Sequence, residues 1–317
     1  MISAWAVEAV ARLDAERERT PATPLRRFPL PDGWQVRLWL KDESTQPTGS
    51  LKHRLARALF RQAIASGRIA EGTTVVEATG GAMAVAQAHF ARLLGLPYIA
   101  VMPEKSSGEG VERLGGTCRH VDPPLAIYGE AEKLAEEVGG HYLDHYAAAA
   151  AVDWHGGDLA EELFGQVAEC PHWVVVDPEN SAYFPGWASG AADYSTGMPS
   201  RIEGIGRPRM EPGFVPDLVD LVVPVPDAAS VAAARRVRQD TGLPVGAATG
   251  TNLWGALELI TRMRAQHVRG DVVTVIGDAD PRHLRTCHDD AWAESRGLDW
   301  RPHATRLERL LDHGEPW

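Results

Sequence analysis

One lysine lies where an amine nucleophile could act. Residues 40–54 have the sequence LKDESTQPTGSLKHR, in which Lys52 follows a Thr-Gly-Ser turn just inside a predicted helix. The positive end of a helix macrodipole disfavours an ammonium ion, and a neutral amine can attack an aldehyde to form a Schiff base. Lys52 is therefore a candidate Schiff-base residue. From spacing alone, the alternative is a surface lysine in a first helical turn.

The histidines and cysteines give no comparable signal. Five histidines contain no pair at metal-ligand spacing on one predicted helix, and no metal site is predicted; these histidines are His53, His89, His141, His145 and His155. The cysteines are too few and too widely spaced for a disulfide framework or a Cys-x-x-Cys site; they are Cys118, Cys170 and Cys287.

Strand and helix patterns alternate on both sides of Lys52. Apolar periodicity predicts helices at 3–18, 51–66, 82–94, 109–114, 126–138, 228–241 and 253–266. Strands are predicted at 35–40, 73–77, 96–102, 173–177, 218–225 and 272–276, with short ones near Cys118 and Tyr142. Glycine and proline predict a loop over 178–213 and a turn over 246–251. This alternation predicts an α/β fold with helices on both faces of a sheet.

Composition limits the function classes. The chain has 317 residues, is 44% hydrophobic and carries a formal charge of -11, which fits two globular domains and disfavours binding to nucleic acid or anionic membranes. Neither a secretory signal nor a run of 18 apolar residues is present. The expected protein is cytoplasmic and acts on a small molecule.

Several motifs, in order, resemble those of one enzyme family. The lysine segment is similar to the P-T-G-S-x-K signature of the cysteine synthase and cystathionine β-synthase family, whose cofactor is pyridoxal 5'-phosphate (PLP). EATGGAM at 77–83 resembles its substrate-carboxylate loop, and RIEGIG at 201–206 its active-site wall. The cysteine desulfhydrase branch carries SLKHRLAR, VDPENSA, SRIEGIGRPR and TGTNLWGA, seen here at 50–57, 176–182, 200–209 and 249–256. The resemblance covers nearly the whole chain.

The resemblance implies a role for each matching residue. Lys52 would bind the PLP aldehyde and later remove the substrate Cα proton. The substrate carboxylate would bind at the turn formed by Thr79, Gly80, Gly81 and Ala82, and the wall would comprise Glu203, Gly204, Ile205 and Gly206. Thr249 and Gly250 of the last glycine loop, together with Asp278, Ala279 and Asp280 after the last strand, would contact the cofactor.

The resemblance also implies the fold and the domains. The expected fold is that of fold-type II PLP enzymes, like the tryptophan synthase β-subunit, with two three-layer α/β domains and a central cleft. The smaller domain would span 35–146, and the larger would combine 1–34 with 147–317. Homodimers are usual in this family, and the N-terminal helix with Trp5 is a candidate contact.

The sequence departs from the family at three places. PHWVVVDPEN at 171–180 joins the start of one strand to the end of a later one, so a strand, the G-T-G-G-T phosphate loop and a helix are missing from the larger domain. Several charge-assisted hydrogen bonds, each worth about 1.5–3 kcal/mol, are lost with that loop, so weakened PLP binding is expected. Ala82 and Ala279 replace polar residues, and Asp278 or Asp280 could take the place of the serine that normally meets the pyridine nitrogen.

Two functions remain open from the sequence. The first is a PLP-dependent lyase that acts on L-cysteine or a β-substituted alanine by β-elimination or β-replacement through an aminoacrylate. The second is a cofactor-free relative that acts as a binding or regulatory subunit, pairing with itself or with an active relative.

Overall fold

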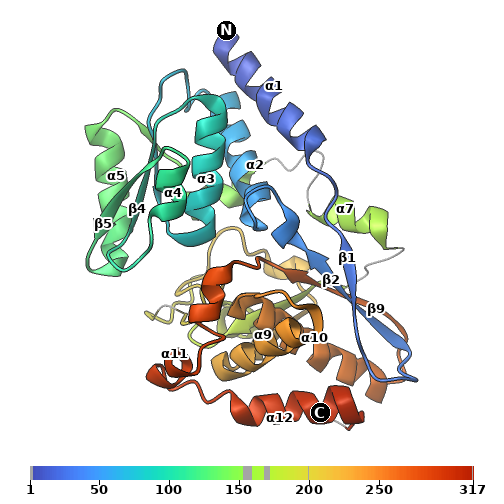
Figure 1. The fold of residues 1–317 in the computed structure, drawn as a ribbon. Coiled ribbons are helices and arrows are strands. Elements are labelled where there is room, and N and C mark those ends of the chain that lie inside the picture. Colours follow the sequence, from blue (N-terminus) through green and yellow to red (C-terminus); the bar gives the residue numbers. More distant parts are fainter. Residues whose placement is uncertain (1–2, 153–158, 168–171, 199, 316) are drawn as a thin grey trace. The chain divides into compact units, whose positions relative to one another are not determined.

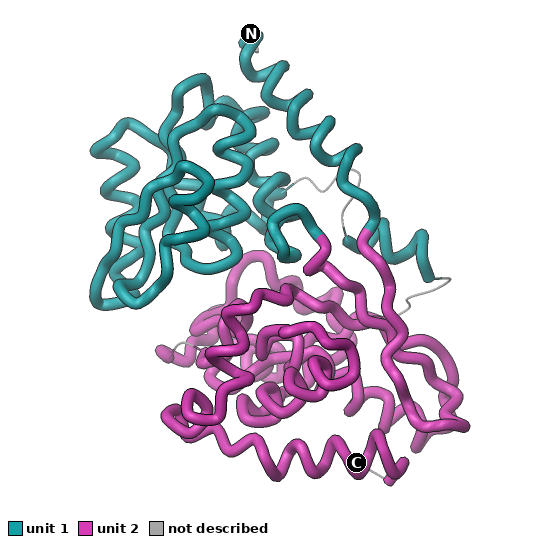
Figure 2. The backbone as a smooth tube through the Cα atoms, viewed as in Figure 1, with its two compact units in different colours: residues 1–22, 46–167 teal, residues 23–45, 168–317 magenta. Residues whose placement is uncertain are grey.

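The computed structural model describes residues 3–152, 159–167, 172–198, 200–315 and 317, so His155 and Cys170 lie outside the described residues. The chain divides into two compact units (Figure 2). Unit 1 comprises residues 1–22 and 46–167, and unit 2 comprises residues 23–45 and 168–317. Within the described ranges, no helix combines the length and the apolar character needed to cross a bilayer.

These boundaries differ from the expected domains in three segments: residues 1–22 and 147–167 belong to unit 1, and residues 35–45 belong to unit 2. Helix α1 (Ala4–Arg19) therefore lies in unit 1, although it was expected in the same domain as the C-terminal residues. Its buried residues Ala6, Ala9 and Leu13 join the core formed by α2 and α3, and this apolar contact decides the grouping. Ser3 starts the helix as its N-cap, with its Oγ accepting the Ala6 amide at 3.1 Å.

Unit 1 contains a four-stranded parallel sheet in the order β5-β4-β3-β6. Its strands are β3 (Val75–Ala78), β4 (Tyr98–Pro103), β5 (Thr117–Val121) and β6 (His141–Tyr142). All four residues of β3 are buried, as expected for a central parallel strand covered on both faces.

Helices cover both faces of this sheet and give unit 1 three layers. One face packs on α1, α2 (Lys52–Ala65) and α3 (Gly81–Leu94), and the opposite face packs on α5 (Ile127–Glu137). Figure 1 shows α5 and α3 on opposite sides of β4 and β5. The remaining helices of unit 1 are α4 (Glu109–Arg113), α6 (His145–Ala148) and α7 (Leu159–Gln166).

Unit 2 contains two small sheets. Strand β2 (Val36–Asp42) pairs antiparallel with β1 (Leu25–Phe28) and parallel with β9 (Gly270–Ile276). A separate parallel pair is formed by β7 (Val174–Pro178) and β8 (Leu221–Val225). The resemblance predicts that a strand, the phosphate loop and a helix of the family pattern are missing before β7.

The helices of unit 2 gather around one apolar core. Helices α9 (Asp227–Thr241) and α10 (Ala247–Ala265) pack closely on each other, α10 also contacts strands of both sheets, and α12 (Arg301–His313) packs on α9. Figure 1 shows α12 running beneath α9 and α10. The other helices are α8 (Tyr183–Ser189) and α11 (Asp290–Ser295).

Two expectations for unit 2 were wrong. The predicted loop over 178–213 contains α8, whose start is stabilised because Asp177 accepts the Phe184 amide at 2.7 Å. The predicted turn over 246–251 is the N-cap and first turn of α10. There, close packing of Gly250 on α9 outweighs the low helix propensity of glycine and threonine.

Candidate active site

Lys52 is the first residue of α2, as the sequence predicted. Gly49, in the left-handed region at φ +73°, donates its amide to the Gln46 carbonyl at 2.7 Å and closes the turn before the helix. The Ser50 hydroxyl then accepts the Lys52 amide at 3.2 Å. The Lys52 side chain is partly exposed, so the local fold holds this amine at a helix N-terminus without burying it.

The predicted carboxylate turn starts the neighbouring helix in the same unit. Thr79 is buried and donates its amide to Val101 at 3.0 Å, while Gly80 is the N-cap of α3 and Gly81 follows at φ +61°. A Cβ on Gly80 would lie 3.2 Å from the Ser106 hydroxyl, so the turn is compact. The free amides at the start of a 14-residue helix favour an anion, and the turn stays the predicted carboxylate site.

A buried polar network that the sequence did not predict lies immediately behind this turn. Glu77, on β3, is fully buried; its carboxylate accepts the Gln87 side-chain amide at 2.9 Å and lies 3.2 Å from Nδ1 of His145. The Tyr98 hydroxyl donates to Gln87 at 2.9 Å, and burial, with the nearby Glu77 charge, raises the Tyr98 pKa well above its ordinary value.

The network ties β3 and α3 together on either side of the turn at Thr79. The only hint of it in the sequence was a glutamate within the apolar run Val75–Ala78.

The predicted cofactor residues of unit 2 come together where β9 ends and α10 begins. The Thr249 hydroxyl accepts the Gly277 amide at 3.2 Å. A Cβ on Gly246, the N-cap of α10, would lie 3.2 Å from the Asp278 carboxylate. The end of β9 and the start of α10 therefore form one local site in unit 2.

The individual side chains of that site have neighbours of their own. Asp278 lies 2.8 Å from Nε2 of His283, and Asp280 accepts the Arg282 amide at 2.8 Å. Ala279 packs against the core of unit 2. The pyridine-nitrogen role predicted for this segment stays a prediction, and Asp278 is the residue whose carboxylate is braced by a histidine.

Gly250 has a packing function that accounts for the absence of a side chain. A Cβ there would lie 1.9 Å from the Ser230 carbonyl oxygen and 2.6 Å from the Ala234 amide nitrogen, both on the backbone of α9. Glycine thus allows the close approach of α9 and α10. The cofactor contact predicted for Gly250 remains untested.

The predicted active-site wall belongs to the same unit. Glu203 pairs with Arg282 at 2.9 Å, which joins the wall segment to the end of β9. Gly204 and Gly206 both have positive φ, and a Cβ on Gly206 would lie 2.7 Å from Pro178. Ile205 is partly buried between them.

The comparisons with known proteins identify the family. A family model described as pyridoxal-phosphate dependent enzyme matches residues 14–177, which is more than half of the chain. The L-cysteine desulfhydrase Cds1 of Mycobacterium tuberculosis is 45% identical, over 93% of this chain and 91% of that protein. This chain belongs to the family of pyridoxal-phosphate dependent enzymes.

More distant relatives agree with this assignment. An O-acetylserine dependent cystathionine beta-synthase of Bacillus subtilis is 27% identical, over 84% of this chain and 93% of that protein. The crystal structure of an O-ureido-L-serine synthase superposes with a TM-score of 0.73 at 22% identity, covering 88% of this chain and 98% of that one. The α/β fold expected from the sequence is thereby confirmed.

The alignment with the desulfhydrase extends over 335 positions, more than the 317 residues of this chain, so the relative has residues for which this chain has none.

The residues of this family member fit part of its cofactor. Lys52, a partly exposed residue at the first turn of α2, would hold the aldehyde. At the start of α9, the Asp227 carboxylate accepts the Glu179 amide at 3.2 Å and is paired with Arg201 at 2.8 Å. The fit to the cofactor therefore rests on Lys52 and the aldehyde.

Proposed function

We propose that this chain is a PLP-dependent lyase that releases sulfide from L-cysteine by β-elimination, with β-replacement by a second nucleophile as the related outcome. The observation that carries the proposal is the position of Lys52, a partly exposed amine at the first residue of α2, within a motif common to this enzyme family. Cysteine is proposed as the substrate because the 45% identical relative is an L-cysteine desulfhydrase.

The residues of unit 1 have distinct tasks in this proposal. PLP, when bound, withdraws electrons from the substrate Cα. The Lys52 amine would hold the cofactor aldehyde and would accept the Cα proton, while the amides at Gly81 and Ala82 would bind the substrate carboxylate. Glu77 and Gln87 fix the two ends of that turn. Asp278, braced by His283, is the proposed partner of the pyridine nitrogen.

A second function is favoured by one specific observation. Because the sequence resemblance predicts that the family's phosphate loop is missing before β7, a cofactor-free chain serving as a binding or regulatory subunit is the alternative proposal. Such a chain would keep the fold and lose stable PLP binding.

The lysine content of the chain allows a direct test. The chain has only four lysines, Lys41, Lys52, Lys105 and Lys133, so borohydride reduction after PLP addition followed by peptide mapping identifies the acceptor. The proposal expects PLP on Lys52, together with sulfide and pyruvate release from L-cysteine that Lys52→Ala abolishes. Lys133→Ala, at an exposed site on α5, is the matched control and should behave as the unchanged protein.

Each result decides between the two functions. Labelling of Lys52 with turnover supports the lyase. Absence of labelling at saturating PLP, with no sulfide released, refutes the lyase and supports the cofactor-free subunit.

We further propose that the chain forms a cytoplasmic homodimer. Val7 on α1 is 61% exposed, which adds apolar surface to the helix expected to make the contact. Cys118 and Cys287 are free thiols, in keeping with a reducing compartment. Light scattering of the purified chain and of Val7→Glu tests the dimer; a monomeric unchanged protein would refute it.

A further inference from the structure

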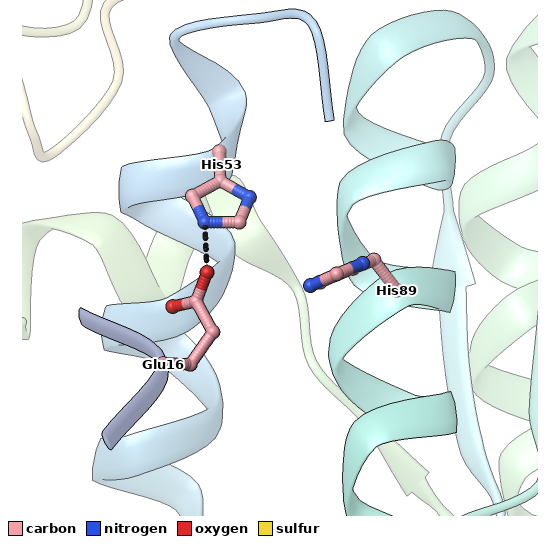
Figure 3. Close-up of side chains that lie close together, drawn as sticks. All are labelled: Glu16, His53 and His89. Carbon is pink, nitrogen blue, oxygen red and sulfur yellow. Dashed lines mark hydrogen bonds and ion pairs between the residues drawn. The ribbon is translucent and has the colours of Figure 1, made fainter. Parts of the chain in front are cut away.

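Three side chains from three different helices of unit 1 converge, two of them buried and the third, His89, partly buried. Glu16 comes from α1, His53 from α2 and His89 from α3, and Figure 3 shows the two imidazoles and the carboxylate directed toward one another. One ligand-type atom from each residue lies within 4.8 Å of the other two. We propose that Glu16, His53 and His89 form a binding site for a divalent transition-metal ion, with Zn²⁺ as the best match.

The chemistry of the three donors matches that metal. Two imidazole nitrogens and one carboxylate oxygen are a recurrent Zn²⁺ ligand set, and the fourth tetrahedral position is left to water. Ligand atoms on one tetrahedral Zn²⁺ lie about 3.3 Å apart, given metal-ligand distances of about 2.0–2.1 Å. The His53 Nε2 and Glu16 Oε1 atoms are 2.9 Å apart, and the ligand atoms of all three residues lie within 4.8 Å of one another. Metal binding therefore requires side-chain movements that bring the three atoms to about 3.3 Å from one another.

His89 supplies the independent sign that a ligand belongs here. Its Nε2 atom is shielded from solvent and has no hydrogen-bond partner among the described residues. Its ring lies 5.4 Å from the His53 ring, measured between centroids. Nearly all buried polar atoms in folded proteins have a partner, so an unsatisfied nitrogen directed at another imidazole and a carboxylate fits an ion that all three share.

Surrounding groups hold the two other donors in position. Thr48 Oγ1 lies 3.2 Å from Nδ1 of His53, so the hydroxyl orients the ring and leaves Nε2 toward the cluster. Arg57 pairs with Oε2 of Glu16 at 3.3 Å, and therefore the other carboxylate oxygen, Oε1, faces His53. Partners of this kind fix ligand orientation in metal sites. The positive charge of Arg57 opposes the ion, so we expect moderate rather than very tight binding.

The proposed ion would connect the helices that carry the site. His53 directly follows Lys52, and a metal bound to it would tie the first turn of α2 to α1 and α3. Because an ion bound only to the folded state stabilises that state, Zn²⁺ should raise the unfolding temperature of the chain. This inference does not depend on PLP or on turnover.

The test uses metal binding to the full chain stripped of metal by a chelator. Equilibrium dialysis with Zn²⁺ should give one ion per chain, and Co²⁺ should give the visible absorption of a tetrahedral site. His89→Ala should weaken Zn²⁺ binding about a hundredfold or more, and Glu16→Gln about tenfold or more. Both variants should also lose the Zn²⁺-dependent rise in unfolding temperature.

Two control variants address other ligands on the same unit. His120→Ala removes an exposed imidazole, and Cys118→Ser removes a partly exposed thiol, and both should bind Zn²⁺ like the unchanged chain. Zn²⁺ binding that survives His89→Ala, or that is lost in either control, overturns the proposal. Should His89→Ala fail to fold, the unchanged chain decides alone: fewer than one Zn²⁺ bound, or no tetrahedral Co²⁺ spectrum, also overturns it.

Discussion

Replacing Gln87 by leucine tests whether the buried network holds the β3–α3 connection. Gln87 is fully buried; its side chain donates to Glu77 at 2.9 Å and accepts from the Tyr98 hydroxyl at 2.9 Å. Loss of the bond to the carboxylate costs about 1.5–3 kcal/mol, and the buried hydroxyl left without its acceptor adds about 1–3 kcal/mol. Because leucine conserves the volume, we expect Gln87→Leu to lower the free energy of unfolding of unit 1 by about 3–5 kcal/mol.

A double-mutant cycle separates the two bonds. Tyr98→Phe alone removes one donor and should cost about 1–2 kcal/mol. In Gln87→Leu combined with Tyr98→Phe, the unsatisfied hydroxyl is gone, so the total cost should fall below the sum of the single changes by about 1–2 kcal/mol.

The assay must report on unit 1 by itself, because two units need not unfold together. Hydrogen exchange in peptides from β3 and α3 gives the local opening free energy, and peptides from α9 serve as the internal control. Single changes that add within about 0.5 kcal/mol, or a cost of Gln87→Leu below about 1 kcal/mol, would refute the network's role.

Two further changes test unit 2. Gly250→Ala should lower the free energy of unfolding by more than about 3 kcal/mol, because its Cβ would lie 1.9 Å from the Ser230 carbonyl oxygen. In thermal unfolding, the control Gly129→Ala should be neutral or stabilising, because a Cβ there has no neighbour within 4 Å. A Gly250→Ala variant as stable as the unchanged chain would contradict the packing role. Burial raises the pKa of Asp177 above its ordinary value of 3.8, despite the opposing hydrogen bond from the Phe184 amide. The folded state therefore binds a proton on Asp177 more tightly than the unfolded state does, and the stability contributed by this group falls as the pH rises from 3.8 through the raised pKa. Urea titrations at several pH values should show a smaller fall in the free energy of unfolding for Asp177→Asn. A pH profile identical to that of the unchanged chain would contradict this assignment.

Local sequence signals were sufficient to predict the family, the order of most elements and the position of Lys52. Lys52 was placed in the first turn of a helix because a glycine turn and apolar periodicity are local signals, and the structure starts α2 at that residue. The absence of the family's phosphate loop stays a prediction from the order of the motifs. The boundaries of α8 and α10 could not be predicted from the sequence, because their starts depend on a capping contact from Asp177 and on the packing of Gly250 against α9.

Contacts between polar residues far apart in the sequence could not be predicted, because they depend on how the elements pack. Glu16, His53 and His89 lie on three helices, and no spacing along one helix could predict their convergence. Likewise, Glu77 meets Gln87 because β3 and α3 fold back around the turn at Thr79. Sequence patterns indicate which face of a helix or strand is buried. Which side chain of another element contacts that face depends on how the elements pack.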